Sequence, residues 1–412
     1  MTSLRNDTLA HDQLLDRLLQ DALEAVRAYL RLEVAFISEF KYGRRVFRYV
    51  DSEAVFSPVS VGASELLEES YCQRVVDGRL PELIPNATEN REARTLPVTM
   101  LMPIGVHVSV PIKLDEGEIF GTLCCFSRQP NYTLDERDLE VVRLYADFVG
   151  RALKRSLGDK RALQKAYERL CNVLDEQHFH IVYQPIIHVG MNKLVGHEVL
   201  TRFTAEPFRS PDKWFNEAAT VGLQEELEFA VIRKALADFH HFPDDTYLSF
   251  NVSPGTILKG SVPALFAGYP LQRVVLEVTE HESIDNYSAI ADELAPLRQQ
   301  GLRLAVDDAG SGYASFRHIL KLKPDVIKLD ASLVEAIDKD QSIRALAAAL
   351  IRFAEETGSK VVAEGVEREE ELEVLRQLKV NKAQGYLLGR PCPLKDLTFW
   401  SRCQSQDFHR LL

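Results

Sequence analysis

Eight short β-rich runs alternate with helical stretches in the part of the chain that follows His178. This alternation is typical of βα units, and it constrains the fold more than any other feature of the sequence. The runs expected as strands are residues 180–187, 193–201, 246–252, 273–279, 302–307, 325–329, 360–364 and 380–384. The clearest helices are expected at residues 213–240, 287–300, 332–357 and 367–378. Roughly 230 residues in eight β units predict an α/β TIM-type barrel at 178–412, because that size suits one barrel, which closes its own edges.

The pattern before residue 155 is different. Apolar residues recur at helical spacing from Leu14 to Tyr29, and residues 36–49 and 106–126 each fit two strands joined by a turn. The turn of the second pair, Asp115-Glu116-Gly117, is a strong hairpin signal. These features predict an α+β domain with an antiparallel sheet at residues 1–155.

A helix is expected to join the two domains. Residues 135–157 form an amphipathic pattern, and apolar residues at alternating spacings of four and three continue it to Leu174. The segment 156–177 is therefore predicted to be a connecting helix. Its apolar stripe fits either pairing in a homodimer or packing on its own domain, and the sequence leaves both open.

Composition argues against several classes of protein. The formal net charge of −12 disfavours non-specific binding to a nucleic-acid polymer. The six cysteines form no CxxC pair and no zinc-ligand spacing, so a reducing cytoplasm is expected. The N-terminus lacks a signal pattern, and the richest apolar stretch, 345–353, is too short to span a bilayer, so we expect no membrane insertion.

Polar side chains interrupt the expected strands near their C-terminal ends, where barrels of this type carry functional residues. In chain order they are Glu198, Asn251, Glu277, Asp307 with Asp308, Lys328, Glu364 and Gln384. Carboxylate and amide oxygens without histidine or cysteine favour Mg²⁺ or Mn²⁺ over zinc. Two adjacent aspartates could serve two ions, and paired ions suit phosphodiester cleavage.

Each of these residues alone has a simpler explanation. A carboxylate at a strand end is usually a turn or helix-cap residue, and the run from Asp307 to Gly312 also resembles an incomplete calcium loop. Lys328 inside an apolar strand is harder to explain, because a buried ammonium needs anionic neighbours. Their joint occurrence favours two-metal phosphoester chemistry.

Motifs across residues 178–405 resemble those of the EAL phosphodiesterases of bacterial cyclic di-GMP signalling. The motif that names this family stands here as Glu198-Val199-Leu200, followed by Thr201-Arg202. The other matches are Gln184-Pro185-Ile186, Phe250 to Pro254, Leu276 to Glu280, Asp307 to Ser315, Ile327 to Asp330, Ala363 to Glu367 and Gln384-Gly385-Tyr386. The resemblance implies a barrel with one strand opposite to the rest, which hydrolyses cyclic di-GMP to linear pGpG.

The resemblance also implies roles for single residues. The first metal ion would be bound by Glu198, Asn251, Glu277 and Asp307. Asp307 would bridge to a second ion, bound with Asp308 and Glu364. The implied catalytic residues are Lys328, Glu364 and Glu198, with Lys328 orienting or activating a water between the ions. The implied substrate contacts are Gln184, Arg202 and Gln384, and Glu280 would anchor the loop after the fifth strand.

Two positions depart from the family pattern. Val199 replaces the alanine of the EAL motif, and the loop after the fifth strand reads DDAGSGY where DDFGTGY is common. Both changes spare the implied ligands, and the complete ligand set favours an enzyme. The loop change leaves the level and control of activity open. The alternatives are a catalytically silent cyclic di-GMP receptor and a protein-interaction module.

Residues 15–155 resemble the GAF sensory domains. The matching runs are Tyr71 to Gly78, Val108 to Ile112 and Phe120 to Cys124. The resemblance implies a domain that modulates the barrel, but it does not identify a ligand.

The cysteines of this region have two interpretations. Cys72, Cys124 and Cys125 could be chromophore or redox sites, but no histidine adjoins them, so buried structural cysteines are favoured. His107 is interpreted as a strand residue rather than a haem ligand.

Overall fold

The computed structural model describes residues 2–53, 59–102, 104–115, 118–278, 286–310 and 313–397, and it describes only the backbone of 2–12, 115 and 313–316. The chain divides into two compact units, Met1–Lys165 and Ala166–Leu412. A single helix, α4 (Glu136–Asp175), contributes residues to both units.

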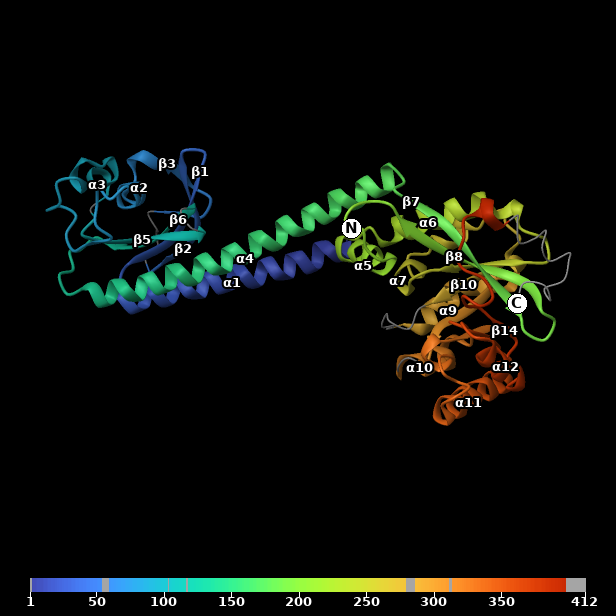
Figure 1. The fold of residues 1–412 in the computed structure, drawn as a ribbon. Helices are drawn as coiled ribbons and strands as arrows, with labels where there is room; N and C mark the ends of the chain where they lie inside the picture. The colour runs from blue at the N-terminus through green and yellow to red at the C-terminus, as the bar shows by residue number, and fades with distance from the viewer. Residues whose placement is uncertain are drawn as a thin grey trace. The chain divides into compact units, whose positions relative to one another are not determined.

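The first unit is built on a six-stranded antiparallel sheet with the order β3-β2-β1-β6-β5-β4 (Figure 1). Its strands are β1 (Val34–Lys41), β2 (Arg44–Ser52), β3 (Ser64–Leu66), β4 (Leu83–Ile84), β5 (Val106–Asp115) and β6 (Glu118–Ser127). Its other helices are α1 (Thr2–Leu30), α2 (Tyr71–Val76) and α3 (Pro97–Leu101), with short turns η1 (Leu67–Glu69) and η2 (Ala93–Thr95). Both predicted strand pairs are confirmed, although Glu116 and Gly117 of the second turn lie outside the described residues.

The two faces of this sheet have different coverings, because successive strand residues point to opposite sides. Val106, Val108 and Val110 of β5 pack in one cluster with apolar residues of α1 and α4. The opposite face packs against α2, where Cys72 of the helix and Cys124 of β6 share a second cluster. Figure 1 shows α1 and α4 running along one side of the sheet and α2 lying on the other.

The second unit is a closed eight-stranded barrel with the order β10-β11-β12-β13-β14-β7-β8-β9. Its strands are β7 (Phe179–His188), β8 (Lys193–Phe203), β9 (Tyr247–Asn251), β10 (Val274–Val278), β11 (Arg303–Ala309), β12 (Val326–Leu329), β13 (Lys360–Ala363) and β14 (Lys382–Ala383). β7 pairs antiparallel with both β8 and β14, whereas the other neighbours pair in parallel. The predicted TIM-type barrel with one opposed strand is therefore confirmed.

Helices cover the barrel. The longer ones are α5 (Pro211–Val221), α6 (Gln224–Ala237), α9 (Tyr287–Gln299), α10 (Tyr313–Leu322), α11 (Gln341–Thr357) and α12 (Glu369–Gln377). The short ones are η3 (Phe239–His241), α7 (Pro254–Ile257), α8 (Val262–Leu265), η4 (Leu271–Arg273) and η5 (Ala331–Leu333).

Two predicted helices are wrong in extent. The helix expected at 213–240 is interrupted at Gly222, which has a φ of 73° and ends α5, because glycine adopts this left-handed conformation without a steric penalty. The helix expected at 332–357 is a short turn, η5, followed by a separate α11. Asp340 caps α11 by accepting hydrogen bonds from the N–H groups of Ser342 and Ile343, so the helix begins there.

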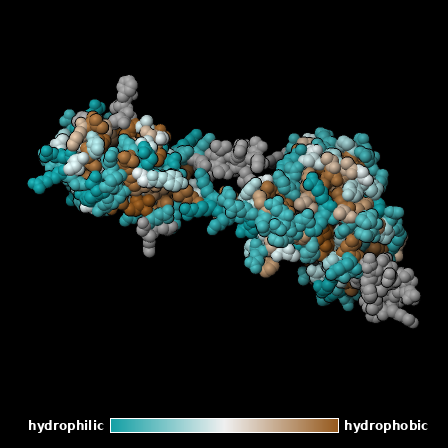
Figure 2. All heavy atoms as spheres, turned by 90° about the horizontal axis from the view of Figure 1, so that it is seen from above, coloured by the Kyte–Doolittle hydropathy of each residue, from teal (hydrophilic) through white to brown (hydrophobic). Residues whose placement is uncertain are grey.

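Hydrophilic side chains cover much of the surface that faces the viewer in Figure 2, with apolar side chains between them. Among the residues described, no helix combines the length and the apolar character that crossing a membrane requires.

Candidate active site

Lys328 lies at the centre of the residues predicted from the strand ends. It is in β12, is 2% exposed, and its Nζ contacts carboxylates from four other parts of the barrel. The distances are 2.8 Å to Oε2 of Glu277, 2.8 Å to Oε1 of Glu364, 3.0 Å to Oδ1 of Asp307 and 3.6 Å to Oε1 of Glu198. The parallel arrangement of the strands explains this convergence, because their C-terminal ends meet at one end of the barrel.

Electrostatics keep the Lys328 side chain charged. Burial alone would lower the pKa of Lys328, but Asp307, Glu198, Glu277 and Glu364 together raise it well above its ordinary value. Burial raises the pKa of Glu277 to about 8, and it also raises the pKa of Glu364 well above the ordinary range. One ammonium therefore does not neutralise the carboxylates crowded around it.

Asp307 and Asp308 lie together despite being neighbours on a strand, where side chains normally alternate between faces. The register of β11 against β12 shifts between Val306 and Ala309, and Asp308 has a φ of 53°. Such a bulge redirects a side chain. Oxygens of Asp307, Asp308 and Glu364 all lie within 4.8 Å of one another as a result.

Glu364 is held at the start of the loop that follows β13. Its backbone N–H donates to the carbonyl of Leu329 at 3.1 Å. The next residue, Gly365, has a φ of 69°, and a Cβ there would lie 2.6 Å from Cβ of Ala331. A side chain at position 365 would therefore force the loop, and Glu364 with it, out of place.

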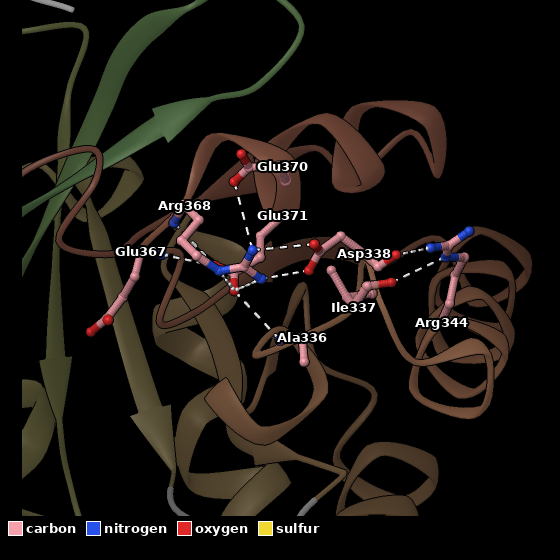
Figure 3. Close-up of polar contacts among 8 residues, drawn as sticks. All are labelled: Ala336, Ile337, Asp338, Arg344, Glu367, Arg368, Glu370 and Glu371. Atoms are coloured by element: carbon pink, nitrogen blue, oxygen red, sulfur yellow. Dashed lines mark hydrogen bonds and ion pairs between the residues drawn. The ribbon is translucent and has the colours of Figure 1, made fainter.

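The far end of the same loop is fixed by Glu371 of α12. Its Oε2 accepts hydrogen bonds from the backbone N–H groups of Glu367 and Arg368, each at 3.1 Å. Figure 3 shows the guanidinium of Arg368 bonded to the carboxylates of Asp338 and Glu371, while Oε1 of Glu371 also accepts from the N–H of Ala336. These contacts of Glu371, Arg368 and Asp338, which we call the loop clamp, connect the Glu364 loop to the segment before α11.

Two glutamines form a buried chain beside Glu198. Nε2 of Gln384 donates to Oε2 of Glu198 and, at 3.0 Å, to Oε1 of Gln184. Gln184 in turn donates to the carbonyl of Gly389 at 3.2 Å, and Asn251 donates to Oε1 of Glu198 at 3.3 Å. Oε1 of Gln384 is buried without a hydrogen-bond partner among the described atoms, so it can accept from a bound group.

For two predicted residues, the described part of the chain gives no contact with this cluster. The Arg202 guanidinium, on β8, donates to the carbonyl of Thr201 at 2.9 Å. Glu280 lies outside the described residues, as do Ser311 and Gly312 of the DDAGSGY loop. Sequence reasoning missed Ser249, whose hydroxyl donates to Oε1 of Glu277. The signal was present, because Ser249 and Asn251 share one face of β9 at a spacing of two.

Comparison with known proteins identifies the family. The family model described as EAL domain matches residues 161–391, which are more than half of the chain. The chain belongs to the EAL domain family. The model described as GAF domain matches residues 14–153, so the first unit carries a GAF domain and the barrel is the EAL domain.

Curated relatives align mainly with the EAL domain. A protein named probable cyclic di-GMP phosphodiesterase PdeD, from Escherichia coli K12, is 31% identical over 250 residues, or 58% of this chain and 46% of PdeD. Cyclic di-GMP phosphodiesterase PdeF of the same organism is 32% identical over 255 residues, or 59% of this chain and 34% of PdeF. This chain therefore spans less than half the length of each of these relatives.

A solved structure extends the likeness to three dimensions. The PaMucR phosphodiesterase in complex with c-di-GMP superimposes with a TM-score of 0.51 and 26% identity. The superposition covers 57% of this chain and 99% of the PaMucR chain. The match therefore spans nearly the whole PaMucR chain.

Proposed function

We propose that the EAL domain hydrolyses cyclic di-GMP to linear pGpG with two divalent ions, Mg²⁺ or Mn²⁺. The observation that carries this proposal is the contact of Lys328 with four carboxylates at the C-terminal ends of the strands. The substrate is supported by the relatives named cyclic di-GMP phosphodiesterases.

The donor set fits divalent metal ions. Four carboxylates contact the ammonium of Lys328, a fifth, from Asp308, has an oxygen within 4.8 Å of oxygens of Asp307 and Glu364, and the Asn251 amide donates to Glu198. Hard oxygen donors are the ligands that Mg²⁺ and Mn²⁺ prefer. Burial of these carboxylates is costly unless positive charge compensates it. We propose that one ion is bound by Glu198, Asn251, Glu277 and Asp307, and the other by Asp307, Asp308 and Glu364.

Side chains of the protein would orient the attacking water and transfer protons. When bound, two divalent ions would lower the pKa of the attacking water and stabilise charge on the phosphate. Lys328 would orient that water through its Nζ, and Glu364 would accept a proton at Oε, consistent with its raised pKa. Formation of pGpG breaks a bond from phosphorus to a 3′ oxygen, which must gain a proton. Glu364 would return that proton.

Contacts to the nucleotide are assigned by the same proposal. Oε1 of Gln384 would accept a hydrogen bond from the substrate, because that atom is buried and otherwise unsatisfied among the described residues. Gln184 holds Gln384 in place at 3.0 Å. Arg202 would contact the substrate after releasing the carbonyl of Thr201.

The test is turnover of cyclic di-GMP by the full chain in Mg²⁺ or Mn²⁺, with product separated by chromatography. We expect pGpG to accumulate and EDTA to stop its formation. Tight binding without pGpG would favour a silent receptor instead. Failure to bind any cyclic dinucleotide would favour a protein-interaction module.

We also propose that the GAF domain modulates this activity and that the chain forms a homodimer. Helix α4 supports the first part, because it contributes residues to both units. Exposed apolar residues on α4, Leu144 and Phe148, support the second. The domain boundaries at residues 155 and 178 remain predictions.

A further inference from the structure

The GAF domain contains a pair of thiols that the proposed phosphodiesterase chemistry does not use. Sγ of Cys72, on α2, lies 3.4 Å from Sγ of Cys124, on β6, and both residues are fully buried. α2 packs against β6, so the contact joins two elements that are separated along the chain. A disulfide bond is about 2.05 Å long, so a small movement separates this pair from a covalent link.

The surroundings of the two sulfurs differ. Nη1 of Arg45 donates to Sγ of Cys72 at 3.1 Å, and Arg45 is itself only 4% exposed. Sγ of Cys124 lies instead beside two neutral hydroxyls, 3.1 Å from Oγ of Ser109 and 3.2 Å from Oγ1 of Thr122. A buried guanidinium favours a thiolate, which is the reactive form of cysteine. Cys72 is therefore the nucleophile of the pair.

Electrostatics agree with this assignment. Burial opposes a charge on Cys72, but the hydrogen bond with Cys124 and the charge of Arg45 outweigh it and lower the pKa of the Cys72 thiol. Burial raises the pKa of Cys124 well above its ordinary value, so Cys124 keeps its proton.

We propose that Cys72 and Cys124 form a reversible disulfide when hydrogen peroxide oxidises the GAF domain. The Cys72 thiolate attacks one peroxide oxygen, so that an S–O bond forms, the O–O bond breaks and hydroxide leaves. Sγ of Cys124 then attacks the Cys72 sulfur, which forms the S–S bond, breaks the S–O bond and releases the oxygen as water with the proton of Cys124. The sulfurs lose two electrons and the peroxide gains them. Both sulfurs are buried, so the oxidant must be small.

Cys125 provides a matched control within the same strand. It is also fully buried, but it packs in the cluster with α1 and α4 on the opposite face of the sheet. Burial raises the pKa of its thiol far above the ordinary value. Cys125 should therefore stay reduced under conditions that oxidise Cys72.

The experiment treats the native full chain with hydrogen peroxide, alkylates the remaining thiols and maps the peptides by mass spectrometry. Cys124 and Cys125 share one tryptic peptide, between Lys113 and Arg128, so serine variants must assign the bond. We expect the link to Cys72 to form in the wild type and in Cys125→Ser, and dithiothreitol to remove it. In Cys124→Ser we expect no link, and we expect a dimedone adduct, which marks sulfenic acid, on Cys72 when the oxidised chain is unfolded in the presence of dimedone.

Several results would overturn the proposal. They are a Cys72 that stays alkylatable in the wild type, a link that survives in Cys124→Ser, and a link lost in a Cys125→Ser chain that melts like the wild type. Arg45→Gln tests the role of the guanidinium, and we expect link formation to slow at least about tenfold. An unchanged rate in an Arg45→Gln chain that also melts like the wild type would contradict that role. If that variant does not fold, dimedone labelling of Cys124→Ser still tests whether peroxide oxidises Cys72, and absence of the adduct would overturn the proposal.

Discussion

Replacing Lys328 removes the ammonium among the carboxylates without removing any proposed metal ligand. In Lys328→Met the side-chain length is kept, but Glu277, Glu364 and Asp307 lose the ammonium within 3.0 Å. We expect turnover of cyclic di-GMP to fall by about 10²- to 10⁴-fold, because a group that orients and activates the water is gone. The measurements are the rate of pGpG formation and the affinity for metal ions.

The Lys328→Met variant should also be less stable than the wild type. Breaking a buried ion pair costs about 3–5 kcal/mol, so Lys328→Met should unfold at lower denaturant concentration without added metal. Mn²⁺ should restore more stability to this variant than to the wild type. The control is Lys321→Met, which replaces an exposed lysine of the same domain and should change neither property. Full turnover in Lys328→Met would refute its assigned role.

A second buried lysine of the barrel, Lys382, predicts that stability depends on pH. Lys382 of β14 is mostly buried, and Nζ donates to the Tyr247 hydroxyl at 3.1 Å. Burial, with Arg303 and Lys360, lowers the pKa of Lys382 to about 8. Between pH 8 and its ordinary pKa, the unfolded chain binds more protons at this site than the folded chain.

The unfolding free energy of the wild type, relative to Lys382→Met, should therefore rise with pH above 8, by at most about 1.4 kcal/mol per pH unit. The difference should be flat below pH 7. Trp214 is buried in α5 of the second unit, and residues 1–165 contain no tryptophan, so fluorescence of Trp214 during denaturation reports on the EAL domain. A difference that stays constant from pH 7 to 10 would contradict this prediction.

At this scale the sequence predicted which residues converge but not how two of them do so. Glu198, Glu277 and Asp307 could be placed because strand ends of a parallel barrel share one end. The pairing of Asp307 with Asp308 depends on a bulge and a left-handed φ at a non-glycine residue, and neither has a reliable local signal in one sequence.

Among the elements, α12 makes the most specific prediction. Glu371 is 2% exposed and connects the Glu364 loop to Ala336 through backbone hydrogen bonds. Glu371→Ala leaves those N–H groups without an acceptor, and each buried donor so left lowers the free energy of unfolding by about 1–3 kcal/mol. We expect lower stability of the EAL domain and a lower kcat, because Glu364 is no longer fixed.

The same helix supplies the control for this change. Glu373→Ala removes an exposed carboxylate two residues away, and it should leave both stability and kcat close to wild type. A Glu371→Ala chain with lower stability but wild-type kcat at saturating metal would contradict the positioning of Glu364 by the loop clamp.

The contacts of helix α4 predict where the chain can be truncated to leave a stable barrel. Ala166, Leu170 and Val173 on its last turns are buried, and Arg169 pairs with Glu217 of α5 at 2.5 Å. A chain of residues 166–412 should therefore be more stable than one of residues 178–412, by several kcal/mol, since burial of a leucine-sized side chain contributes about 1.5–3 kcal/mol. Thermal melts of the two chains test this, and equal midpoints would contradict it.

Element positions were predicted well where the hydrophobic pattern was the deciding signal. The strand expected at 180–187 is β7, Phe179–His188, and the strand expected at 360–364 is β13, Lys360–Ala363. The errors lie in helices, where an apolar pattern continued across Gly222 and across the turn before Asp340. Capping geometry, rather than periodicity, determines those boundaries.

For the molecule as a whole, the main expectation is that one chain combines a GAF unit and a catalytic EAL barrel. The family match fixes the two domain types, while the activity of this chain depends on whether its carboxylate cluster turns over substrate. A net charge of −12 also makes binding of an anionic dinucleotide dependent on local cations rather than on the overall field.

The most direct test is therefore turnover of cyclic di-GMP by the full chain in ¹⁸O-labelled water with Mn²⁺, analysed by mass spectrometry. We predict pGpG with one ¹⁸O atom in its terminal phosphate, because water supplies the new oxygen on phosphorus. Asp307→Asn, which removes the charge proposed to bridge both ions, should lower this product at least about 10³-fold. Absence of pGpG from the wild type at saturating Mn²⁺, or an undiminished rate of pGpG formation in Asp307→Asn, would contradict the proposed two-metal hydrolysis.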